Sequence, residues 1–266
     1  VRSRNLEHVL EEVRTLAASG YKEVVLTGIH LSSYGIDTGE SLLELIQKVH
    51  EIDGIKRIRL GSLEPRIITE EFASSIAVLP KMCPHFHLSL QSGCNATLKR
   101  MNRRYSAEEY MEKCDLLRKY FHNPALTTDV IVGFPGETEQ DFEDTMDVVE
   151  KVQYDSAFTF IYSKRTGTPA AAMEDQVPEE VVKERFDRLL KRVQEISAEK
   201  TQAGAGVVED VLVEDVNKQE TGYVTGRTAR NYLVHFPGDA SLIGTIVPVR
   251  LCESKGFYYY GKQCEQ

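Results

Sequence analysis

The cysteines of this 266-residue chain are few and scattered. No two of them stand at Cys-x2-Cys or Cys-x3-Cys spacing, and the five are Cys83, Cys94, Cys114, Cys252 and Cys264. Because an iron–sulfur cluster needs several converging thiolates, the sequence predicts no metal site. Cys83 and Cys94 are interpreted as ordinary thiols, since cysteine often serves as a small apolar residue. Unpaired cysteines are also typical of a reducing compartment.

Long apolar runs and an excess of positive charge are missing as well. No apolar run approaches the roughly 20 residues of a membrane-spanning helix, and no signal peptide precedes the first helix. We therefore expect a soluble, cytoplasmic protein with no membrane partner. The formal net charge is −9, from 32 Lys and Arg against 41 Asp and Glu. Whole-chain charge nevertheless says little about a local nucleic-acid surface.

A catalytic constellation of the acid–base or nucleophilic kind is absent too. The chain offers no Ser/His/Asp arrangement and no paired carboxylates that suit such a site. Six scattered histidines are interpreted as surface or core residues: His8, His50, His85, His87, His122 and His235. The sequence therefore predicts no catalytic side chain.

What the chain does contain is a repeated alternation of short apolar strands and helices. Strands are predicted at 23–26, 56–60, 86–90, 128–132 and 157–161, and helices at 6–18, 42–51, 70–78, 107–121 and 141–152. Ser41 with Glu44, and Ser106 with Glu109, are capping boxes that mark two helix starts. This alternation indicates an α/β fold with a parallel sheet.

The run from Thr127 to Glu137 is the most informative segment. Its strand breaks into the turn Gly133-Phe-Pro-Gly136 and then opens a helix, whose start is marked by Thr138 and Asp141. The two glycines permit close backbone approach and Pro135 stiffens the turn, as expected of a cofactor-binding loop. The alternative is an ordinary strand-to-helix turn, which is common.

Each predicted strand is followed by a polar, glycine-bearing segment, at 27–33, 61–65, 91–94, 133–137 and 162–169. Parallel strands point the same way, so all five segments gather at one end of the sheet. In a βα barrel the loops at that end carry the functional site. The first helix, by contrast, has no strand before it, so we expect a fragment of a barrel that starts further upstream.

The pattern changes after a long helix predicted at 179–202. Residues 203–206, Ala-Gly-Ala-Gly, break the helical period, and short alternating strands are predicted at 207–213, 221–225, 232–236, 244–251 and 256–261. We therefore predict two domains, an incomplete barrel over 1–202 and a small β-barrel of the oligonucleotide-binding kind over 203–266.

Charge argues only weakly for RNA binding by the second domain, which has six Lys or Arg against eight Asp or Glu. Arg227, Arg230 and Tyr232 nevertheless fall in one turn. Arginine with an aromatic ring can contact phosphate and stack on an unpaired base. We predict these three as RNA-binding residues, the alternative being a solvated hairpin tip.

Several stretches match a known enzyme family. They are 1–4 (Val-Arg-Ser-Arg), 26–35, 87–93, 98–105, 129–137 (Asp-Val-Ile-Val-Gly-Phe-Pro-Gly-Glu), 162–170 and, in the second domain, 225–232. With them the chain resembles, over its whole length, the radical S-adenosylmethionine methylthiotransferases that modify tRNA and end in a TRAM domain. The form of 27–35, Thr-Gly-Ile-His-Leu-Ser-Ser-Tyr-Gly, is most similar to the branch acting on N6-threonylcarbamoyladenosine at position 37 of tRNA. Branches acting on isopentenyladenosine or on a ribosomal-protein aspartate are the alternatives.

The resemblance implies a partial radical S-adenosylmethionine barrel of TIM-like design followed by a TRAM barrel. It implies S-adenosylmethionine and [4Fe–4S] clusters as cofactors of the intact enzyme. It also implies a monomer whose partners are the tRNA anticodon loop and an electron donor. In the family, a radical made from the cofactor removes hydrogen from C2 of the adenine, and a methylthio group then bonds to that carbon. The protein orients the cofactor and excludes water.

The sequence departs from the family at its cluster ligands. The family's Cys-x3-Cys-x2-Cys loop, which lies just before the Arg-Ser-Arg segment, and the cysteines of its upstream domain have no counterpart here. We therefore expect this polypeptide by itself to be inactive, although its parent enzyme is a methylthiotransferase.

By position, the resemblance also implies a pocket for the organic part of the cofactor. The segment near the methionine end corresponds to Gly28, His30 and Ser32, the next strand end to Ser62 and Glu64, and the ribose and carboxylate contacts to Gln91 and Ser92. Arg103 is the candidate partner of the methionine carboxylate, because a guanidinium matches a carboxylate with two parallel hydrogen bonds; the alternative is a solvated arginine at a helix end. The adenine-contacting strand and turn correspond to Asp129, Ile131, Gly133, Pro135 and Gly136.

Two other functions stay open. One is an RNA-binding protein without catalysis, in which the first domain merely supports the second. The other is an unrelated phosphate-handling barrel enzyme that would cradle phosphate with 166–168, Thr-Gly-Thr. The latter lacks the paired glycine-rich loops that such barrels carry after their last two strands.

Overall fold

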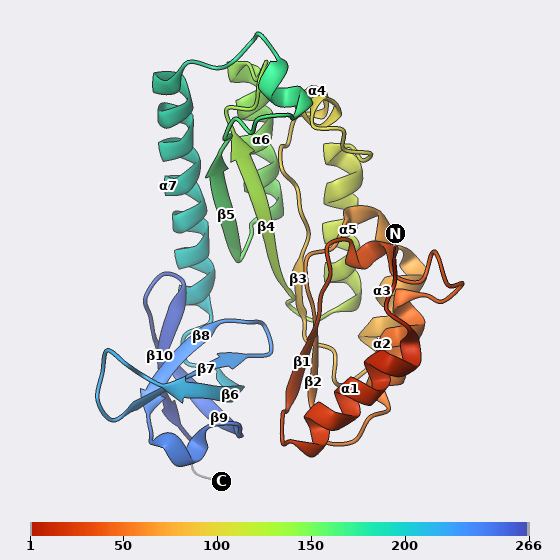
Figure 1. Ribbon diagram of the computed structural model, residues 1–266. Coiled ribbons are helices and arrows are strands. Elements are labelled where there is room, and N and C mark those ends of the chain that lie inside the picture. Colours follow the sequence, from red (N-terminus) through yellow and green to blue (C-terminus); the bar gives the residue numbers. More distant parts are fainter. Residues whose placement is uncertain (1, 265–266) are drawn as a thin grey trace.

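The computed structural model describes residues 2–264, and its first domain is built on five parallel strands (Figure 1). They are β1 (Glu23–Leu26), β2 (Arg57–Leu60), β3 (His85–His87), β4 (Ala125–Val132) and β5 (Ser156–Ile161). β1 pairs with β2 in a two-stranded ladder, and β3, β4 and β5 pair in that order in a three-stranded one. Backbone bonds join the two ladders, from Cys83 N to Ile58 O at 2.9 Å and from Leu63 N to His87 O at 2.8 Å. The result is one curved sheet, in which no ladder pairs β1 with β5 among residues 2–264.

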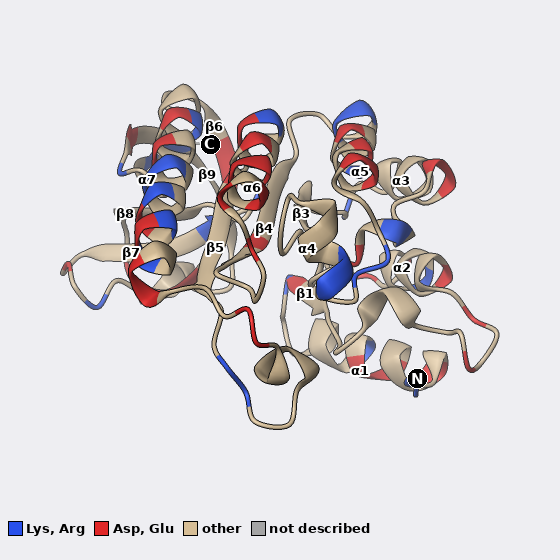
Figure 2. Ribbon diagram, turned by 90° about the horizontal axis from the view of Figure 1, so that it is seen from above, with Lys and Arg blue, Asp and Glu red and all other residues tan. Residues whose placement is uncertain are grey.

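Helices cover the outer face of this sheet, as the view onto the carboxyl ends of the strands shows (Figure 2). They are α1 (Leu6–Ala18), α2 (Leu42–His50), α3 (Glu70–Ala77), α5 (Ala107–Tyr120) and α6 (Glu139–Val152), while the short helix α4 (Asn95–Arg100) lies above the carboxyl ends of the strands (Figure 1). Ser106 with Glu109, and Thr138 with Asp141, form complete capping boxes, whereas Ser41 receives only the backbone N–H of Glu44. Local capping therefore sets several helix starts, as the sequence predicted.

A long helix, α7 (Glu179–Ala203), packs along β5 and leads into the second domain. That domain is a closed barrel in the order β10-β8-β7-β6-β9. Its strands are β6 (Val208–Val216), β7 (Tyr223–Thr228), β8 (Leu233–Pro237), β9 (Ile246–Ser254) and β10 (Tyr258–Gln263). It has its own apolar core, which includes Val211, Phe236 and Tyr259. The prediction of an α/β barrel followed by a small β-barrel is thus confirmed.

Two buried arginines of β2 join the domains. Arg57 donates to the carbonyls of Arg227 at 2.9 Å and Asp210 at 2.6 Å, and Arg59 donates to that of Ala229 at 2.9 Å. Glu23 forms an ion pair with each of the two guanidinium groups. The second barrel therefore docks on the amino-terminal ends of the first-domain strands, opposite the loops at their carboxyl ends.

The structure differs from the predicted elements mainly between 88 and 100. Strand β3 ends at His87 because side chains bind the next carbonyls: Tyr110 Oη donates to Leu88 O at 3.0 Å and Tyr105 Oη to Ser89 O at 2.8 Å. The short helix α4 and four 3-10 turns, Leu31–Ser33, Pro65–Ile67, Pro169–Ala172 and Ala240–Leu242, were not predicted. They are too short for a periodic pattern to reveal.

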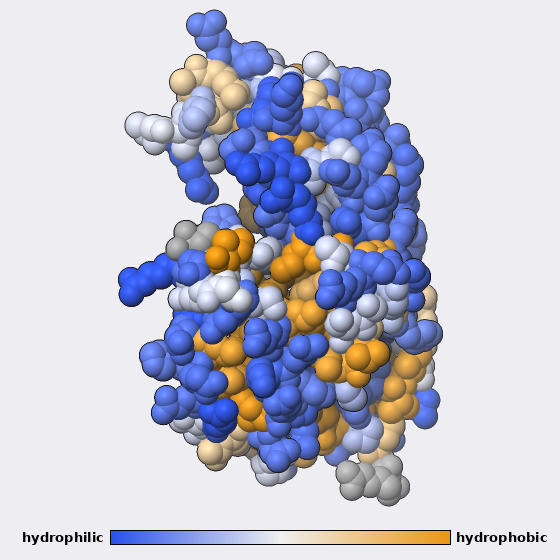
Figure 3. Space-filling model, turned by 90° about the vertical axis from the view of Figure 1, so that its right-hand side faces the viewer, coloured by the Kyte–Doolittle hydropathy of each residue, from blue (hydrophilic) through white to orange (hydrophobic). Residues whose placement is uncertain are grey.

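The surface on the side of α1, α2 and α3 is mostly hydrophilic, with apolar patches across its middle (Figure 3). Within residues 2–264, each helix is either too short or too polar to cross a lipid bilayer.

Candidate functional site

Five of the predicted cofactor residues line one pocket at the carboxyl ends of β1 and β2. The pocket holds about 520 Å³ and is lined by His30, Ser32, Ser62, Glu64 and Arg103. The hydroxyl of Ser32 accepts the backbone N–H of Glu64 at 2.9 Å, which ties the loop after β1 to the loop after β2. The structure therefore brings together side chains from three separate loops.

Arg103 supplies positive charge to this pocket. Its side chain is exposed and forms no ion pair within residues 2–264, whereas Glu64 is paired with Arg66 at 3.1 Å. An unpaired guanidinium beside several hydroxyl groups is suited to bind a carboxylate in bidentate fashion. The pocket thus has the polarity that the amino-acid end of S-adenosylmethionine requires.

Gly28 lies apart, in a larger and more apolar pocket of about 940 Å³ between α1 and β1. His30 borders both pockets. A Cβ at Gly28 would meet nothing closer than 3.9 Å, so packing does not explain a glycine there.

The Gly133–Gly136 turn is held against α7. Gly133 has a φ of +77°, and a Cβ on it would come within 2.6 Å of Val182. Gly133 N also donates to Glu137 Oε1 at 3.1 Å. Glu137 is buried beside Arg185 at 3.0 Å. Burial raises the pKa of Glu137, while the bonds from Gly133 and Arg185 oppose that rise.

Gln91 and Ser92, the predicted ribose and carboxylate contacts, are both buried. Ser92 is buried, and its hydroxyl lies 3.3 Å from Thr145 Oγ1 and accepts Cys94 N at 3.2 Å, so it faces a helix packing contact and away from the pocket. Gln91 has a φ of +72°, and its backbone bonds to Asp129 O at 2.8 Å and Ile131 N at 2.9 Å. Such a conformation in a non-glycine residue costs energy and is frequent at functional sites.

A hydrogen-bonded row crosses the inner face of the sheet. His85 Nε2 lies 3.4 Å from Thr127 Oγ1, which lies 3.0 Å from His87 Nδ1, and His87 Nε2 lies 3.2 Å from Asp129 Oδ2. Burial, aided by the charge of Arg59, lowers the pKa of His85 to about 3. The row holds the predicted residue Asp129 in place. Sequence reasoning missed His87, although the alternation His-Phe-His at 85–87 places both histidines on one face.

The same inner face carries exposed apolar side chains. In register, Phe158 lies beside Asp129, Phe160 beside Ile131, and Val25 beside Arg59. Residues in register in a parallel sheet share a face. Val25, Phe158 and Phe160 are 52%, 56% and 49% exposed. Phe158 and Phe160 therefore form an exposed aromatic wall next to β4, the predicted adenine strand, whereas Val25 lies on β1 at the other edge of the sheet.

The three predicted RNA-binding residues lie at the junction of the domains. Tyr232 is buried and donates its hydroxyl to Asp155, so its ring is not free to stack on a base. Arg230 is paired with Glu209 and lies over the Tyr232 ring. Arg227, which is partly exposed, is 3.4 Å from Glu214. The structure thus gives this turn a docking role that the sequence did not suggest.

The cysteines do not come together in residues 2–264. Cys83, Cys94 and Cys114 are buried at separate places, and burial raises the pKa of each thiol. Within the described part of the chain, the one group of three potential metal ligands is Cys94, Asp141 and Asp144. Asp141 is already engaged, as the acceptor of the Thr138 N–H in the capping box of α6 and as the partner of Arg100 at 2.9 Å.

Two family models match the chain. The radical SAM superfamily matches residues 1–149, and the TRAM domain matches residues 204–263. Curated relatives include two proteins named tRNA-2-methylthio-N(6)-dimethylallyladenosine synthase. The one from Lachnoclostridium phytofermentans is 48% identical over 99% of this chain, and the one from Acetivibrio thermocellus is 50% identical over 94%. The chain spans 58% and 52% of their lengths, about half of each.

Solved structures share the fold at low sequence identity. Coproporphyrinogen III oxidase from Escherichia coli, a radical SAM enzyme, superposes with a TM-score of 0.55 at 11% identity, over 96% of this chain and 64% of that one. The radical S-adenosylmethionine methyltransferase TsrM from Kitasatospora setae, with cobalamin and a [4Fe-4S] cluster bound, gives 0.51 at 16% identity, over 78% and 34%.

These matches confirm the predicted radical SAM and TRAM resemblance. They do not support the predicted threonylcarbamoyladenosine branch, because the relatives carry the name of the dimethylallyladenosine branch. Dimethylallyladenosine is the isopentenyladenosine of the alternative prediction. The short segment 27–35 was too little to separate branches that share their chemistry.

Proposed function

This chain belongs to the radical SAM superfamily, and from that membership we propose that it forms the cofactor-binding and RNA-contacting part of a tRNA methylthiotransferase. One observation carries the proposal: side chains from the loops after β1, β2 and β3 converge on a single polar pocket, and Arg103 stands in it without an ion-pair partner in the described chain. A polar pocket at the carboxyl ends of barrel strands is where enzymes of this architecture bind their ligands.

The residues present suit S-adenosylmethionine. Arg103 would bind the methionine carboxylate, the Ser32 and Ser62 hydroxyls would line the amino-acid end, and Ile131 would pack against the adenine. Bound there, the cofactor supplies the adenosyl group on which this superfamily's chemistry depends. The chain's own residues orient that group and exclude water. An iron–sulfur cluster does not fit the described residues, since their cysteines lie apart.

We propose dimethylallyladenosine at position 37 of the anticodon loop as the substrate, with an external electron donor. The relatives' names support this branch. The exposed aromatic wall of Phe158 and Phe160 supports it as well. A dimethylallyl group is wholly apolar and suits this wall, whereas a threonylcarbamoyl group carries a carboxylate that would lose hydration there.

Replacing Arg103 tests the cofactor site. Arg103→Ala should raise the Kd for S-adenosylmethionine about tenfold or more, because a charge-assisted hydrogen bond contributes about 1.5–3 kcal/mol and 1.4 kcal/mol is a tenfold change. Calorimetric titration of the full chain measures this. Arg14→Ala, on the exposed face of α1, is the matched control and should bind like the unsubstituted chain. Equal binding by both variants would refute the assignment of Arg103.

A second titration tests the substrate. An anticodon stem-loop RNA with dimethylallyladenosine should bind several-fold more tightly than one with threonylcarbamoyladenosine, since each buried methylene contributes about 0.8 kcal/mol. Phe158→Ser with Phe160→Ser should abolish the preference. Val78→Ser, which changes an exposed side chain beyond α3, should keep it. A preference for threonylcarbamoyladenosine would refute this substrate and favour the threonylcarbamoyladenosine branch.

A further inference from the structure

Four aromatic side chains share the outer face of the second barrel. In β10, alternation sends Tyr259 into the core and turns Tyr258 and Tyr260 outward. Tyr260 is in register with His235 of β8, and Thr225, two residues beyond Tyr223 in β7, is in register with the same histidine. Tyr223, His235, Tyr258 and Tyr260 therefore form one strip over three neighbouring strands, here termed the aromatic strip.

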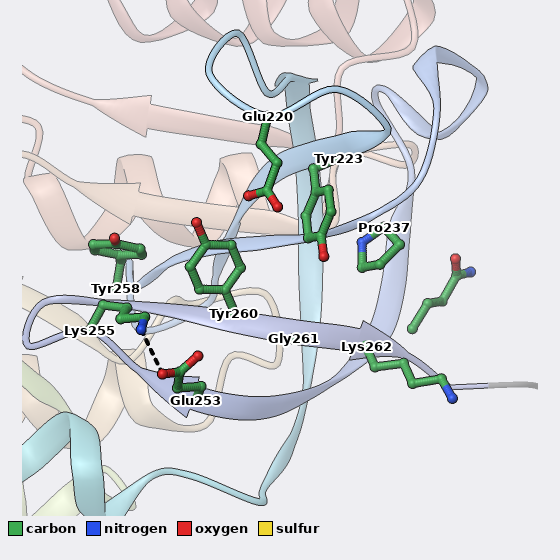
Figure 4. Close-up of a pocket in the computed structure, with 10 residues that line it drawn as sticks. Glu220, Tyr223, Pro237, Glu253, Lys255, Tyr258, Tyr260, Gly261 and Lys262 are labelled. Atoms are coloured by element: carbon green, nitrogen blue, oxygen red, sulfur yellow. Dashed lines mark hydrogen bonds and ion pairs between the residues drawn. The ribbon is translucent and has the colours of Figure 1, made fainter.

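The rings of the aromatic strip contact one another. Ring centroids are 6.0 Å apart for Tyr223 and Tyr260, 5.9 Å for Tyr258 and Tyr260, and 5.2 Å for His235 and Tyr258, all edge to face. An edge-to-face contact covers one face of one ring of the pair and leaves its opposite face free. Its three tyrosines line a hollow of about 700 Å³ together with Glu220, Pro237, Lys255 and Lys262 (Figure 4). Phe257, next to Tyr258, is 69% exposed.

Charge around the strip is mixed and sparse. Lys255 is paired with Glu253 at 2.6 Å, and its ammonium lies 6.0 Å from the centre of the Tyr260 ring. Lys262 has no ion-pair partner among residues 2–264. A hydrogen bond to Glu220 raises the pKa of Tyr260. Duplex binding relies on many lysines and arginines against phosphates, whereas unpaired nucleotides are held mainly by stacking on aromatic rings.

We propose that the aromatic strip is a stacking site for unpaired RNA nucleotides, with Lys262 placed to contact a phosphate. The inference rests on the proposed function, which makes RNA the partner of this chain. It assigns to the strip the role that the sequence predicted for Arg227, Arg230 and Tyr232. Of those three, Tyr232 is buried and Arg230 is engaged in an ion pair at the domain junction. Bases would stack on Tyr223 and Tyr260, whose rings contact each other and line the hollow.

The lack of tryptophan permits a direct spectroscopic test. Tyr260→Trp places a single indole in the aromatic strip of the full chain, and Tyr21→Trp places one at an exposed position in the first domain as the control. An unstructured RNA of about 12 nucleotides, within the site size of one barrel of this kind, should quench the first indole and leave the second unchanged. Equal responses of the two indoles would overturn the proposal.

Affinity gives the second test. Tyr223→Ala with Tyr260→Ala should weaken binding of the same labelled RNA about tenfold or more, because stacking contributes about 1–3 kcal/mol per base. Tyr223→Phe with Tyr260→Phe keeps the rings and should bind like the unsubstituted chain. A paired RNA of equal length should show no such dependence. If the alanine variant melts at the unsubstituted temperature and still binds RNA as tightly, the strip is not the site. S-adenosylmethionine titration of the same samples reports separately on the proposed function.

Discussion

Asp155→Ala should lower the free energy of unfolding by about 3–5 kcal/mol, because it breaks a buried ion pair and leaves Lys200 and Tyr232 without their acceptor. Asp155 lies buried just before β5 and accepts Leu126 N and Lys200 Nζ, each at 2.8 Å, and the hydroxyl of Tyr232. The alanine variant loses the three hydrogen bonds through which this carboxylate joins β4, α7 and the second barrel. Urea denaturation measures the loss, and faster proteolysis near Gly204 would report the uncoupling of the domains.

Two variants frame this expectation. Asp155→Asn keeps an acceptor but removes the charge, and should lose about 1–3 kcal/mol. Asp115→Ala removes a carboxylate that is 80% exposed on α5 and should change the unfolding free energy by less than about 0.5 kcal/mol. If Asp155→Ala costs no more than Asp115→Ala, the link between the domains does not depend on this carboxylate.

His85 should make the protein lose stability in acid. Its folded pKa is about 3 against 6.5 for an ordinary histidine, because burial and the charge of Arg59 disfavour its protonation. Between these values the unfolded chain binds more protons than the folded one, so stability rises with pH and falls as the pH drops below 6.5. From pH 7.5 to 4.5 this group alone should cost about 3 kcal/mol.

The difference between variants isolates this contribution from those of the carboxylates. His85→Gln cannot be protonated, so its stability should fall less steeply in acid than that of the unsubstituted chain. His122→Gln, at an exposed position, should preserve the original slope. If the free energy of unfolding falls equally steeply with pH for His85→Gln and for the unsubstituted chain, the pKa of His85 is the same in the folded and the unfolded states, and the prediction is wrong.

Much of the fold was readable because its signals are local. The first helix and first strand match their predicted bounds, 6–18 and 23–26, and the capping boxes at Ser106 and Thr138 form as predicted. Each such signal acts over a few residues, through capping or the spacing of apolar side chains. Strand β3 was predicted, but it ends at His87 and not at Leu90, because Tyr105 and Tyr110 bind the carbonyls of Ser89 and Leu88.

The candidate site was readable only in part. Strand order alone predicts that 27–33 and 61–65 meet, and His30, Ser32, Ser62 and Glu64 do line one pocket. Ser92 is buried beside Thr145 of α6, a packing contact that no local pattern of the sequence records. In the second domain, Tyr232 and Tyr260 look alike in sequence, yet one is buried against Asp155 and the other stands on the surface.

The sequence by itself determined the α/β barrel, the small β-barrel after it, the loops that gather at one end and the family to which they belong. These follow from periodicity, capping and motif spacing, which depend on near neighbours. Only the tertiary structure decided that Arg57 and Arg59 anchor the second barrel, that Asp129 is held by His87, and that the free aromatic rings lie on β7, β8 and β10. Contacts between residues far apart in the chain follow from how whole elements pack, and no local pattern records that packing.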